Sequence, residues 1–299
     1  MVGGECELAY GQHQSFYLRD RWLSKGLKHL MEDERFFYNK DSFELIGLGK
    51  NMLQSLRFWV VATRTVVEKF NNQQKKVHYI TPLGNIIYKF DRFVQFYETA
   101  SILHYELTKE KEPATAWYWF FNILRQDSIS KDELLQLFIQ WVNREENKEI
   151  STKSLKRDIE CLVKLYTAGQ STFDPEEVIQ SPLYKIGLLE EKNGIIYKKT
   201  GEIEKIGLTA LMYSLLDYKD KKGLETISVD EIVNEEGLWG KVFNMNRASV
   251  VNALEMLTNH TVYKLSFTRT NNLDTVKLPS ISAIDYLEYE YKRKVEALV

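Results

Sequence analysis

Apolar and polar residues alternate along the chain in patterns that predict one order of elements three times. Each segment shows helix, turn, helix and then two short strands. In the first segment the helices are expected over 19–31 and 51–70, where apolar residues recur at three- and four-residue steps. Its strands are expected at 77–80 and 86–88, on either side of the turn sequence 81–85.

The second and third segments carry clearer signals. A serine followed three residues later by glutamate predicts a capping box at Ser130 and again at Ser228. The pair Asn193-Gly194 predicts a hairpin between strands at 188–192 and 195–199, because both residues tolerate a positive φ. The remaining expected elements are helices over 130–142, 151–166 and 246–258, strands over 262–268 and 275–278 joined by a turn through 269–273, and a charged last helix over 284–296.

Between the first two segments lie two strongly apolar helices, expected over 93–106 and 113–124. The second contains the densest aromatic cluster, 117–121, which fits a buried core better than a base-stacking platform because its rings occupy all sides of the helix. We therefore predict a mainly α fold with small β-hairpins, in which tandem winged-helix-like units surround a helical core. The expected domains are 1–92 (N-terminal unit), 93–126 (aromatic-rich helical connector), 127–206 (second winged-helix-like unit) and 207–299 (third unit with the C-terminal helix).

Composition narrows the expected location and partners. The formal net charge of the 299 residues is −2, so binding to nucleic acid must rest on local patches. Residues 1–76 carry 12 Lys and Arg against 9 Asp and Glu, a mild local excess. Cys6 and Cys161 are too few for a disulfide framework or a zinc site. Neither a signal peptide nor a membrane-spanning run is visible, so we expect a cytoplasmic protein without a membrane partner.

A glycine loop, 47–51, precedes the long helix of the first segment. Glycines let a backbone approach a ligand, and the unpaired amides of a helix start attract phosphate. Lys50, Gln54, Arg57, Arg64 and Glu68 are predicted to share one face of that helix. The expected phosphate contacts are Arg19, Arg21, Lys25, Gly49, Lys50, Asn51 and Arg57. The alternative is a plain glycine turn, with Arg57 paired to a carboxylate such as Glu44.

A second basic face is predicted on the helix 151–166, where Lys153, Lys156 and Arg157 lie opposite an apolar stripe. In a winged helix such a helix enters the major groove of DNA, and the hairpin lysines Lys192, Lys198 and Lys199 would touch the backbone. Glu160, Glu190 and Glu191 interrupt this basic surface, and many winged helices bind proteins instead. The matching helix of the third segment carries one cation, Arg247, and fits a protein contact, a homodimer interface or a structural role.

Catalytic chemistry is not evident from residue patterns alone. The five histidines are scattered, and no nucleophile or metal-binding motif appears. A metal-dependent nuclease needs converging carboxylates. The carboxylates near the glycine loop are Asp20, Glu34, Asp41 and Glu44, for which plain surface charge is the alternative role. We therefore assign no catalytic residue and no metal ligand.

Several motifs resemble a bacterial family long described as having unknown function. They are 13–26, 48–52, 55–59, 117–122, 181–183 with 187–189, and 240–243, and together they span nearly the whole chain. The family includes the nicking subunit (SspB) of the single-strand DNA phosphorothioation system, which serves DNA modification and antiphage defence. The resemblance implies DNA as a partner, together with a cysteine desulfurase, an ATP-pyrophosphatase-like sulfur transferase and an ATPase. It also implies Mg²⁺ or Mn²⁺ if the protein is a nickase, although no cofactor is evident from the residues.

The family's characteristic positions correspond here to His13, Arg19, Trp22, Lys25, Gly49, Lys50, Asn51 and Arg57. The family often has an acidic residue after the histidine, where this sequence has Gln14, which puts a metal ligand at that position in doubt. Two hypotheses follow. The protein is a DNA nickase (endonuclease) that opens the strand for sulfur incorporation, or it is a non-catalytic DNA-binding adaptor or regulator that recruits modification enzymes.

Overall fold

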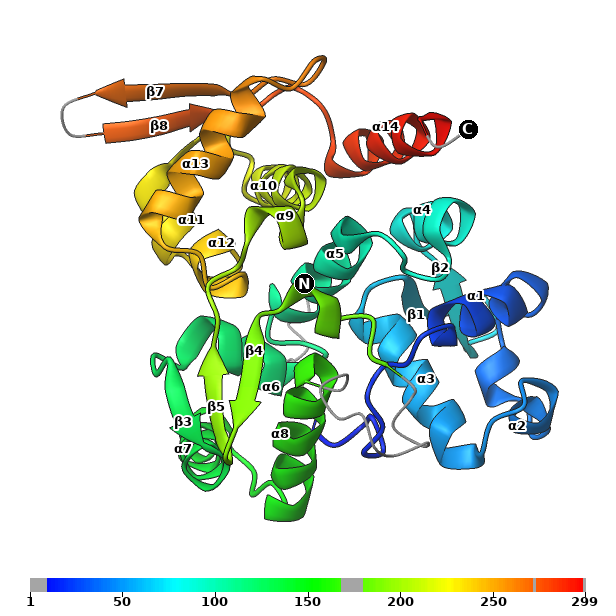
Figure 1. Cartoon of the computed structure of the whole chain (residues 1–299). Coiled ribbons are helices and arrows are strands. Elements are labelled where there is room, and N and C mark those ends of the chain that lie inside the picture. The colour runs from blue at the N-terminus through cyan, green and yellow to red at the C-terminus, as the bar shows by residue number, and fades with distance from the viewer. Residues whose placement is uncertain (1–9, 168–179, 271–272, 298–299) are drawn as a thin grey trace.

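The computed structural model describes residues 10–167, 180–270 and 273–297. Within these ranges the protein is mainly helical, with one two-stranded and two three-stranded antiparallel sheets (Figure 1). The expected mainly α composition with small β-hairpins is therefore confirmed. None of the described helices is long and apolar enough to cross a membrane.

The N-terminal part differs from the prediction after its second long helix. Its elements are α1 (Trp22–Glu32), a 3-10 turn (Phe36–Tyr38), α2 (Ser42–Leu45), α3 (Lys50–Ala62), β1 (Val66–Phe70), β2 (Lys76–Ile80) and α4 (Pro82–Asp91). The hairpin thus joins β1 to β2 rather than 77–80 to 86–88, and the prediction for this hairpin was wrong. The predicted helix 51–70 ends at Ala62, so Arg64 and Glu68 do not share its face with Arg57.

Local chemistry explains both errors. Val66 and Val67 are β-branched and favour a strand, and Val66 is buried. Thr81 caps α4 by accepting a hydrogen bond from the Gly84 amide, with Pro82 as the first helical residue. A Cβ on Gly84 would lie 2.1 Å from the Thr65 carbonyl oxygen, so the glycine lets α4 pack directly on the chain before β1. The turn-forming residues of 81–85 therefore start a helix.

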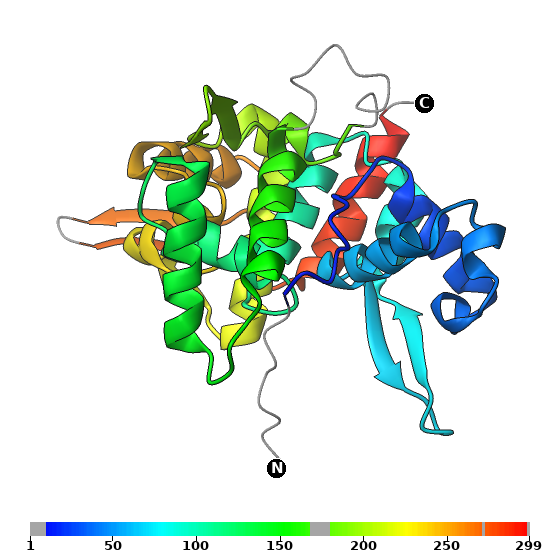
Figure 2. The ribbon, with the colours of Figure 1, turned by 90° about the horizontal axis from the view of Figure 1, so that it is seen from below.

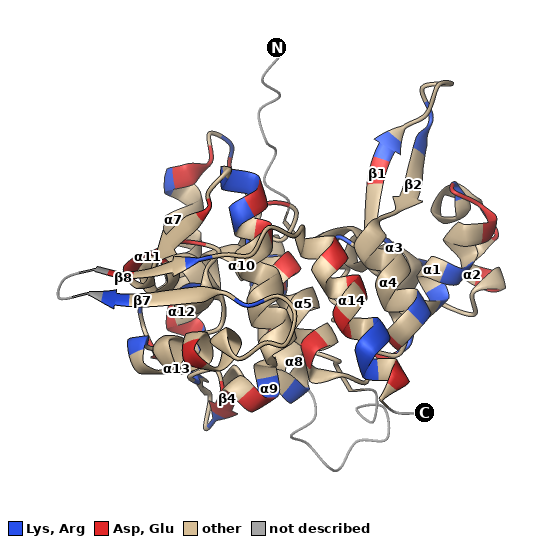
Figure 3. Cartoon of the chain, turned by 90° about the horizontal axis from the view of Figure 1, so that it is seen from above, with Lys and Arg blue, Asp and Glu red and all other residues tan. Residues whose placement is uncertain are grey.

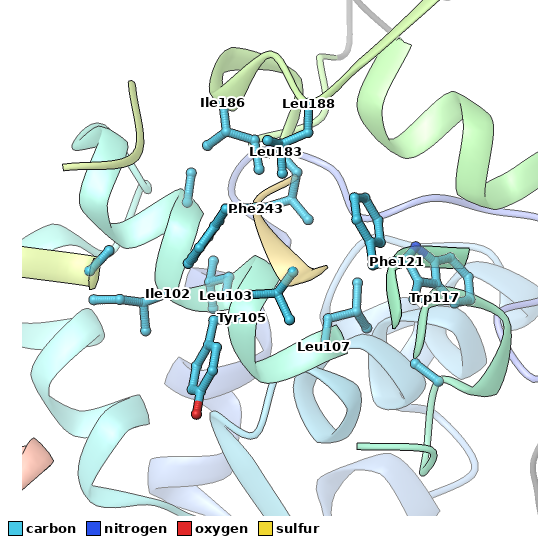
Figure 4. Close-up of a cluster of buried hydrophobic side chains, with 14 of the residues drawn as sticks. Ile102, Leu103, Tyr105, Leu107, Trp117, Phe121, Leu183, Ile186, Leu188 and Phe243 are labelled. Atoms are coloured by element: carbon cyan, nitrogen blue, oxygen red, sulfur yellow. The ribbon is translucent and has the colours of Figure 1, made fainter. Parts of the chain in front are cut away.

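At the centre lies α5 (Tyr97–Thr108), in which every residue from Thr99 to Thr108 is buried. Its side chains pack among residues from distant parts of the chain, as Figure 4 shows for Ile102, Leu103 and Leu107. It is followed by α6 (Thr115–Tyr118) and a π-helical turn (Trp119–Ile123). All five aromatic residues of 117–121 are buried, which confirms their role in the core rather than as a stacking platform.

The last two segments share one topology. The second contains β3 (Ser128–Ser130), α7 (Lys131–Glu145), α8 (Thr152–Thr167), a 3-10 turn (Tyr184–Ile186), β4 (Leu189–Lys192) and β5 (Ile195–Lys198). After α9 (Ile203–Ile206), the third contains α10 (Leu208–Lys222), β6 (Thr226–Ser228), α11 (Val229–Asn234), α12 (Trp239–Val242), α13 (Arg247–Thr258), β7 (Ser266–Thr270), β8 (Leu273–Lys277) and α14 (Ala283–Glu296). In each, the first strand pairs with the last, giving the orders β3-β5-β4 and β6-β8-β7.

Most predictions for these segments are confirmed. Asn193 and Gly194 turn the β4–β5 hairpin with φ of 51° and 76°. Ser228 and Glu231 form the full reciprocal capping box, and Ser130 caps α7 by accepting from the Glu133 amide. The strand expected from 262 begins only at Ser266, and residues 271–272 of the predicted turn lie outside the described residues.

A buried ion network fixes α10 of the third segment to α5. The Lys109 ammonium lies 2.8 Å from a carboxylate oxygen of Glu106 and 2.8 Å from one of Asp217. The Tyr213 hydroxyl donates a 2.8 Å hydrogen bond to Glu106, and the Arg64 guanidinium lies 3.6 Å from the same carboxylate. The side chains of Lys109 and Glu106 are only 6% and 3% exposed, so this contact is made away from water.

Candidate nucleic-acid interface

The glycine loop is open to solvent, as a ligand site requires. Gly47 has a φ of +69°, and a Cβ at Gly47 or Gly49 would meet nothing within 4 Å. The first helical hydrogen bond of α3 runs from the Leu53 amide to the Gly49 carbonyl, and no side chain caps the helix. The amides of residues 50–52 therefore precede the first helical bond at an exposed surface. The Lys50 ammonium lies 4.9 Å from the centre of the Phe43 ring, beside this loop.

Helix α1 brings a second cation to the loop. The Lys25 ammonium donates to the Ile46 carbonyl at 3.4 Å, and Arg21 lies one turn earlier on the same exposed face. Arg21 begins α1 in the left-handed conformation, with φ 65°, and its guanidinium lies 5.9 Å from the Phe93 ring centre. Arg19 is half-buried among aromatic rings, 5.4 Å from that of Trp22. Lys25 and Lys50 thus place two exposed cations beside the glycine loop.

Arg57 takes part in a polar cluster that the sequence did not reveal. Its guanidinium lies 2.5 Å from Glu68 on β1 and donates to the Tyr38 hydroxyl at 2.9 Å. Tyr38 donates to the same Glu68 oxygen at 2.6 Å, and the Lys76 ammonium lies 2.8 Å from the other oxygen. A carboxylate does pair with Arg57, but it is Glu68 rather than Glu44. The Arg57 side chain remains 35% exposed.

Electrostatics keep the Glu68 carboxylate charged. Partial burial alone would raise its pKa, but the hydrogen bonds from Lys76, Tyr38 and Arg57 outweigh burial and lower the pKa to about 2. Glu68 is therefore an anion at neutral pH, and it neutralises part of the positive charge of its two cationic partners. The cluster holds the base of the β1–β2 hairpin against α3.

The basic face of α8 is only partly available. Lys153 and Lys156 are exposed, and Lys156 lies 3.9 Å from Glu160 on the next turn. Arg157 is half-buried and donates to the Ser154 hydroxyl at 3.3 Å. A Cβ on Gly11 would lie 3.0 Å from an Arg157 nitrogen, so the N-terminal segment runs directly beside this side chain. Figure 2 shows that segment passing along α8.

The lysines of the β4–β5 hairpin already bind other groups of the protein. Glu190 lies 2.7 Å from the Lys192 ammonium and 3.5 Å from that of Lys199. Lys198 donates to the Leu124 carbonyl at 2.6 Å, and burial lowers its pKa to about 8. In the third segment Arg247 pairs with Asp230 and lies 3.1 Å from Asp274. Within the second segment, Lys153 and Lys156 are therefore the predicted cations most open to a ligand.

A buried His–Asp pair joins the N-terminal segment to α8. The His13 Nε2 atom lies 2.8 Å from an Asp158 oxygen, and the Gly11 amide donates to both Asp158 oxygens at 2.8 and 3.1 Å. The Ser15 amide donates to His13 Nδ1, so the proton of the neutral ring belongs on Nε2 and points at Asp158. Burial raises the pKa of Asp158 more than His13 and the Gly11 amide lower it. His13 itself is fully buried, which fits packing rather than contact with a ligand.

The carboxylates near the glycine loop do not form a metal centre. Among the residues that the structure describes, no group of three or more His, Cys, Asp or Glu side chains is arranged to hold a metal ion. Of the four acids expected there, Asp41 and Glu44 lie at the start of α2. Glu34 instead lies beside the β1–β2 hairpin, in one pocket with Asn71 and Tyr79.

Comparisons with known proteins identify a family and structures with a similar fold. A family model described as a protein of unknown function, DUF4007, matches residues 10–291. No curated protein matches the sequence. Two crystal structures of SspB match, each at 20% identity over 96% of this chain and 87% of SspB. The magnesium-bound SspB structure has a TM-score of 0.84 and the other has 0.82. The resemblance drawn from the sequence motifs is thus confirmed, and the structural likeness shows a shared fold.

Proposed function

The chain belongs to the DUF4007 family of proteins of unknown function, and on that basis we propose that it is a DNA-binding protein of a bacterial phosphorothioation system. The role in phosphorothioation follows from the family resemblance of its motifs. The observation that carries DNA binding is the open glycine loop, where exposed amides and the ammonium groups of Lys25 and Lys50 lie together. Such a site can bind an anion, and we propose that this anion is the phosphate of DNA.

Arg57 and the α1 arginines extend this proposed contact. One nitrogen of Arg57 is occupied by Glu68 and Tyr38, while its 35% exposed side chain leaves further N–H groups for phosphate. Arg21 is the N-cap residue of α1, one turn before Lys25, and Arg19 lies two residues earlier. Asn51 and Gly49 supply backbone rather than charge. These residues would follow one DNA strand along the N-terminal unit.

The shared topology of the last two segments supports a second DNA contact. We interpret each as a winged-helix unit, because a strand, a helical part and a hairpin follow in that order and the first strand pairs with the last. The helical part is α7 and α8 in the second unit and the shorter α11, α12 and α13 in the third. In this interpretation α8 is the groove helix of the second unit, with Lys153, Lys156 and Arg157 facing DNA. The proposed units correspond to 127–206 and 207–299, and a homodimer through the third unit is the remaining role for α13.

Salt dependence tests the DNA contact. We expect the affinity for a duplex oligonucleotide to fall with salt, with a slope of log K against log salt of magnitude roughly 3 to 6. The double variant Lys25→Ala/Lys50→Ala should lower that magnitude by about 2, since each lost phosphate contact removes about 0.9. Its melting temperature should stay unchanged because both side chains are exposed. Fluorescence anisotropy at several salt concentrations measures the slope.

Lys264→Ala is the matched control, because Lys264 is exposed on the third unit, away from the glycine loop. It should leave the slope at the wild-type value. If the double variant keeps the full slope, or if wild-type affinity is indifferent to salt, the phosphate site is not at the glycine loop.

Nicking and a non-catalytic adaptor role are separated by a plasmid assay. Purified protein is incubated with supercoiled plasmid in Mg²⁺, in Mn²⁺ and in a chelator. Metal-dependent conversion to relaxed circles supports a nickase. Binding without conversion supports an adaptor that recruits the modification enzymes.

A further inference from the structure

The β1–β2 hairpin projects from the body of the protein at the end that carries α1 and α2 (Figures 2 and 3). Its tip is ordered by its own residues. The Asn71 side-chain oxygen accepts from the amides of Gln73 and Lys75 at 2.9 and 3.0 Å. The Asn71 amide in turn donates to the Lys75 carbonyl at 2.9 Å. The projecting end is thus a closed turn with a defined shape.

A large aromatic ring is displayed near this tip. Phe70 ends β1 with 61% of its surface exposed, although burying such a side chain would stabilise the fold by roughly 1.5 to 3 kcal/mol. Phe70 pairs with Lys76 across the hairpin, and the Lys76 ammonium lies 5.8 Å from the ring centre. Tyr79 is 41% exposed on the opposite face. The hairpin therefore offers a ring that the fold itself does not use.

The charge around the ring is positive. Lys69, Lys75 and Lys76 are exposed, and no acidic residue occurs from 69 to 80. The Glu68 carboxylate on the same hairpin is already paired with Arg57 and Lys76. Asp33 and Glu34 share a pocket with the tip residues 71–73, and the Asp33 carboxylate there accepts from the Arg35 amide and from Asn39. An anionic partner therefore complements the tip better than a neutral or basic one.

The hairpin is braced at several points along its length. Arg57 and Tyr38 hold Glu68 on β1. On β2, the Arg35 guanidinium donates to the Lys76 carbonyl at 2.7 Å, and the His78 amide donates to the Glu34 carbonyl at 2.8 Å. A ring carried on such a support can press against a partner without the hairpin folding back.

We propose that the hairpin binds DNA by placing Phe70 against the bases, while Lys69 and Lys75 contact the flanking phosphates. Apolar wedges of this kind insert between base steps, and aromatic rings stack on unpaired bases regardless of sequence. The proposal rests on the DNA binding proposed above and adds that the protein unstacks or opens the strand it holds. A phosphate track alone would leave the bases untouched.

Base unstacking is measured with duplexes that carry 2-aminopurine at successive positions. Wild-type protein should raise the fluorescence at one or two positions, and Phe70→Ala should abolish that rise and weaken binding about tenfold. The salt slope of Phe70→Ala should stay at the wild-type value because no charge is lost. Phe70→Trp should retain both affinity and fluorescence. Val262→Ala, which truncates a side chain 55% exposed on the third unit, is the matched control.

The outcomes separate the two proposals. If wild type shows salt-dependent binding and Phe70→Ala matches it in affinity and fluorescence, DNA binding stands and the wedge is overturned. If wild type does not bind the duplex, the proposed function fails and the wedge with it. Unchanged melting temperature in Phe70→Ala, expected for so exposed a ring, excludes misfolding as the cause of any loss.

Discussion

Replacing Lys109 with methionine is expected to lower the free energy of unfolding by about 3 to 5 kcal/mol. Methionine preserves most of the volume but removes the ammonium that lies 2.8 Å from both Glu106 and Asp217. Those carboxylates are 3% and 19% exposed, so water cannot replace the lost charge fully. Arg64 and Lys221 remain, at 3.6 and 3.9 Å, but neither bridges the two acids. Urea unfolding of the variant and wild type measures the difference.

Lys111→Met is the control for this variant. Lys111 is a lysine two positions later, 44% exposed and paired with a half-exposed Glu145, so its loss should change stability by less than about 1 kcal/mol. Equal effects of the two variants would show that the buried network contributes nothing special to the contact between α5 and α10.

The pH dependence of the free energy of unfolding tests whether the loss of stability in Lys109→Met is electrostatic. Burial alone would raise the pKa of Asp217, but Lys109 lowers this pKa below 3.8. The Asp217 carboxylate therefore stabilises the fold above pH 3.8, and this stabilisation is lost as pH falls through the lower pKa of the folded state. Burial alone would lower the pKa of Lys109, but its two carboxylate partners raise it above 10.5, so its contribution is lost only at higher pH. In Lys109→Met, protonating the stranded acids relieves the defect, and the loss should shrink between neutral pH and about pH 5. A loss independent of pH would indicate packing instead.

The sequence correctly predicted those elements whose conformation is determined by a few neighbouring residues. Asn193-Gly194 gave the correct hairpin because positive φ at both positions is a property of the two residues themselves. The cap at Ser228 was correct for the same reason. The β1–β2 hairpin was missed because Val66 and Val67 continue a helical apolar spacing, while their strand conformation also depends on pairing with Ile80 and Tyr79 beyond the turn.

The candidate site was predictable only in part. The glycine loop and its exposed lysines could be found from spacing, since Gly47, Gly49 and Lys50 are adjacent in sequence. The partner of Arg57 could not, because Glu68 reaches it only when the chain leaves α3 and returns as β1. The engagement of the Lys198 ammonium by the Leu124 carbonyl likewise joins residues that are far apart in sequence.

The His13–Asp158 pair could not be predicted from spacing either, because it joins residues 145 positions apart. It links the segment that leads into α1, which carries Arg19 and Arg21, to α8, which carries Lys153 and Lys156. This buried pair thus contributes to the relative position of both proposed DNA contacts. The aromatic rings of Phe58, Trp59 and Trp117 surround His13, with ring centres 5.7 to 6.4 Å away, and they keep water from the pair.

Asp158→Ala should therefore lower the free energy of unfolding by about 3 to 5 kcal/mol, since it leaves His13 Nε2 and the Gly11 amide buried without their acceptor. Asp158→Asn should cost less, about 1 to 3 kcal/mol, because its oxygen still accepts from Gly11. Glu160→Ala, an exposed acid on the same helix, should change stability by less than about 1 kcal/mol. Urea unfolding measures these differences, and hydrogen exchange of residues 10–18 should rise in Asp158→Ala before global unfolding. If that segment stays protected, the junction is held by the aromatic rings rather than by the buried pair.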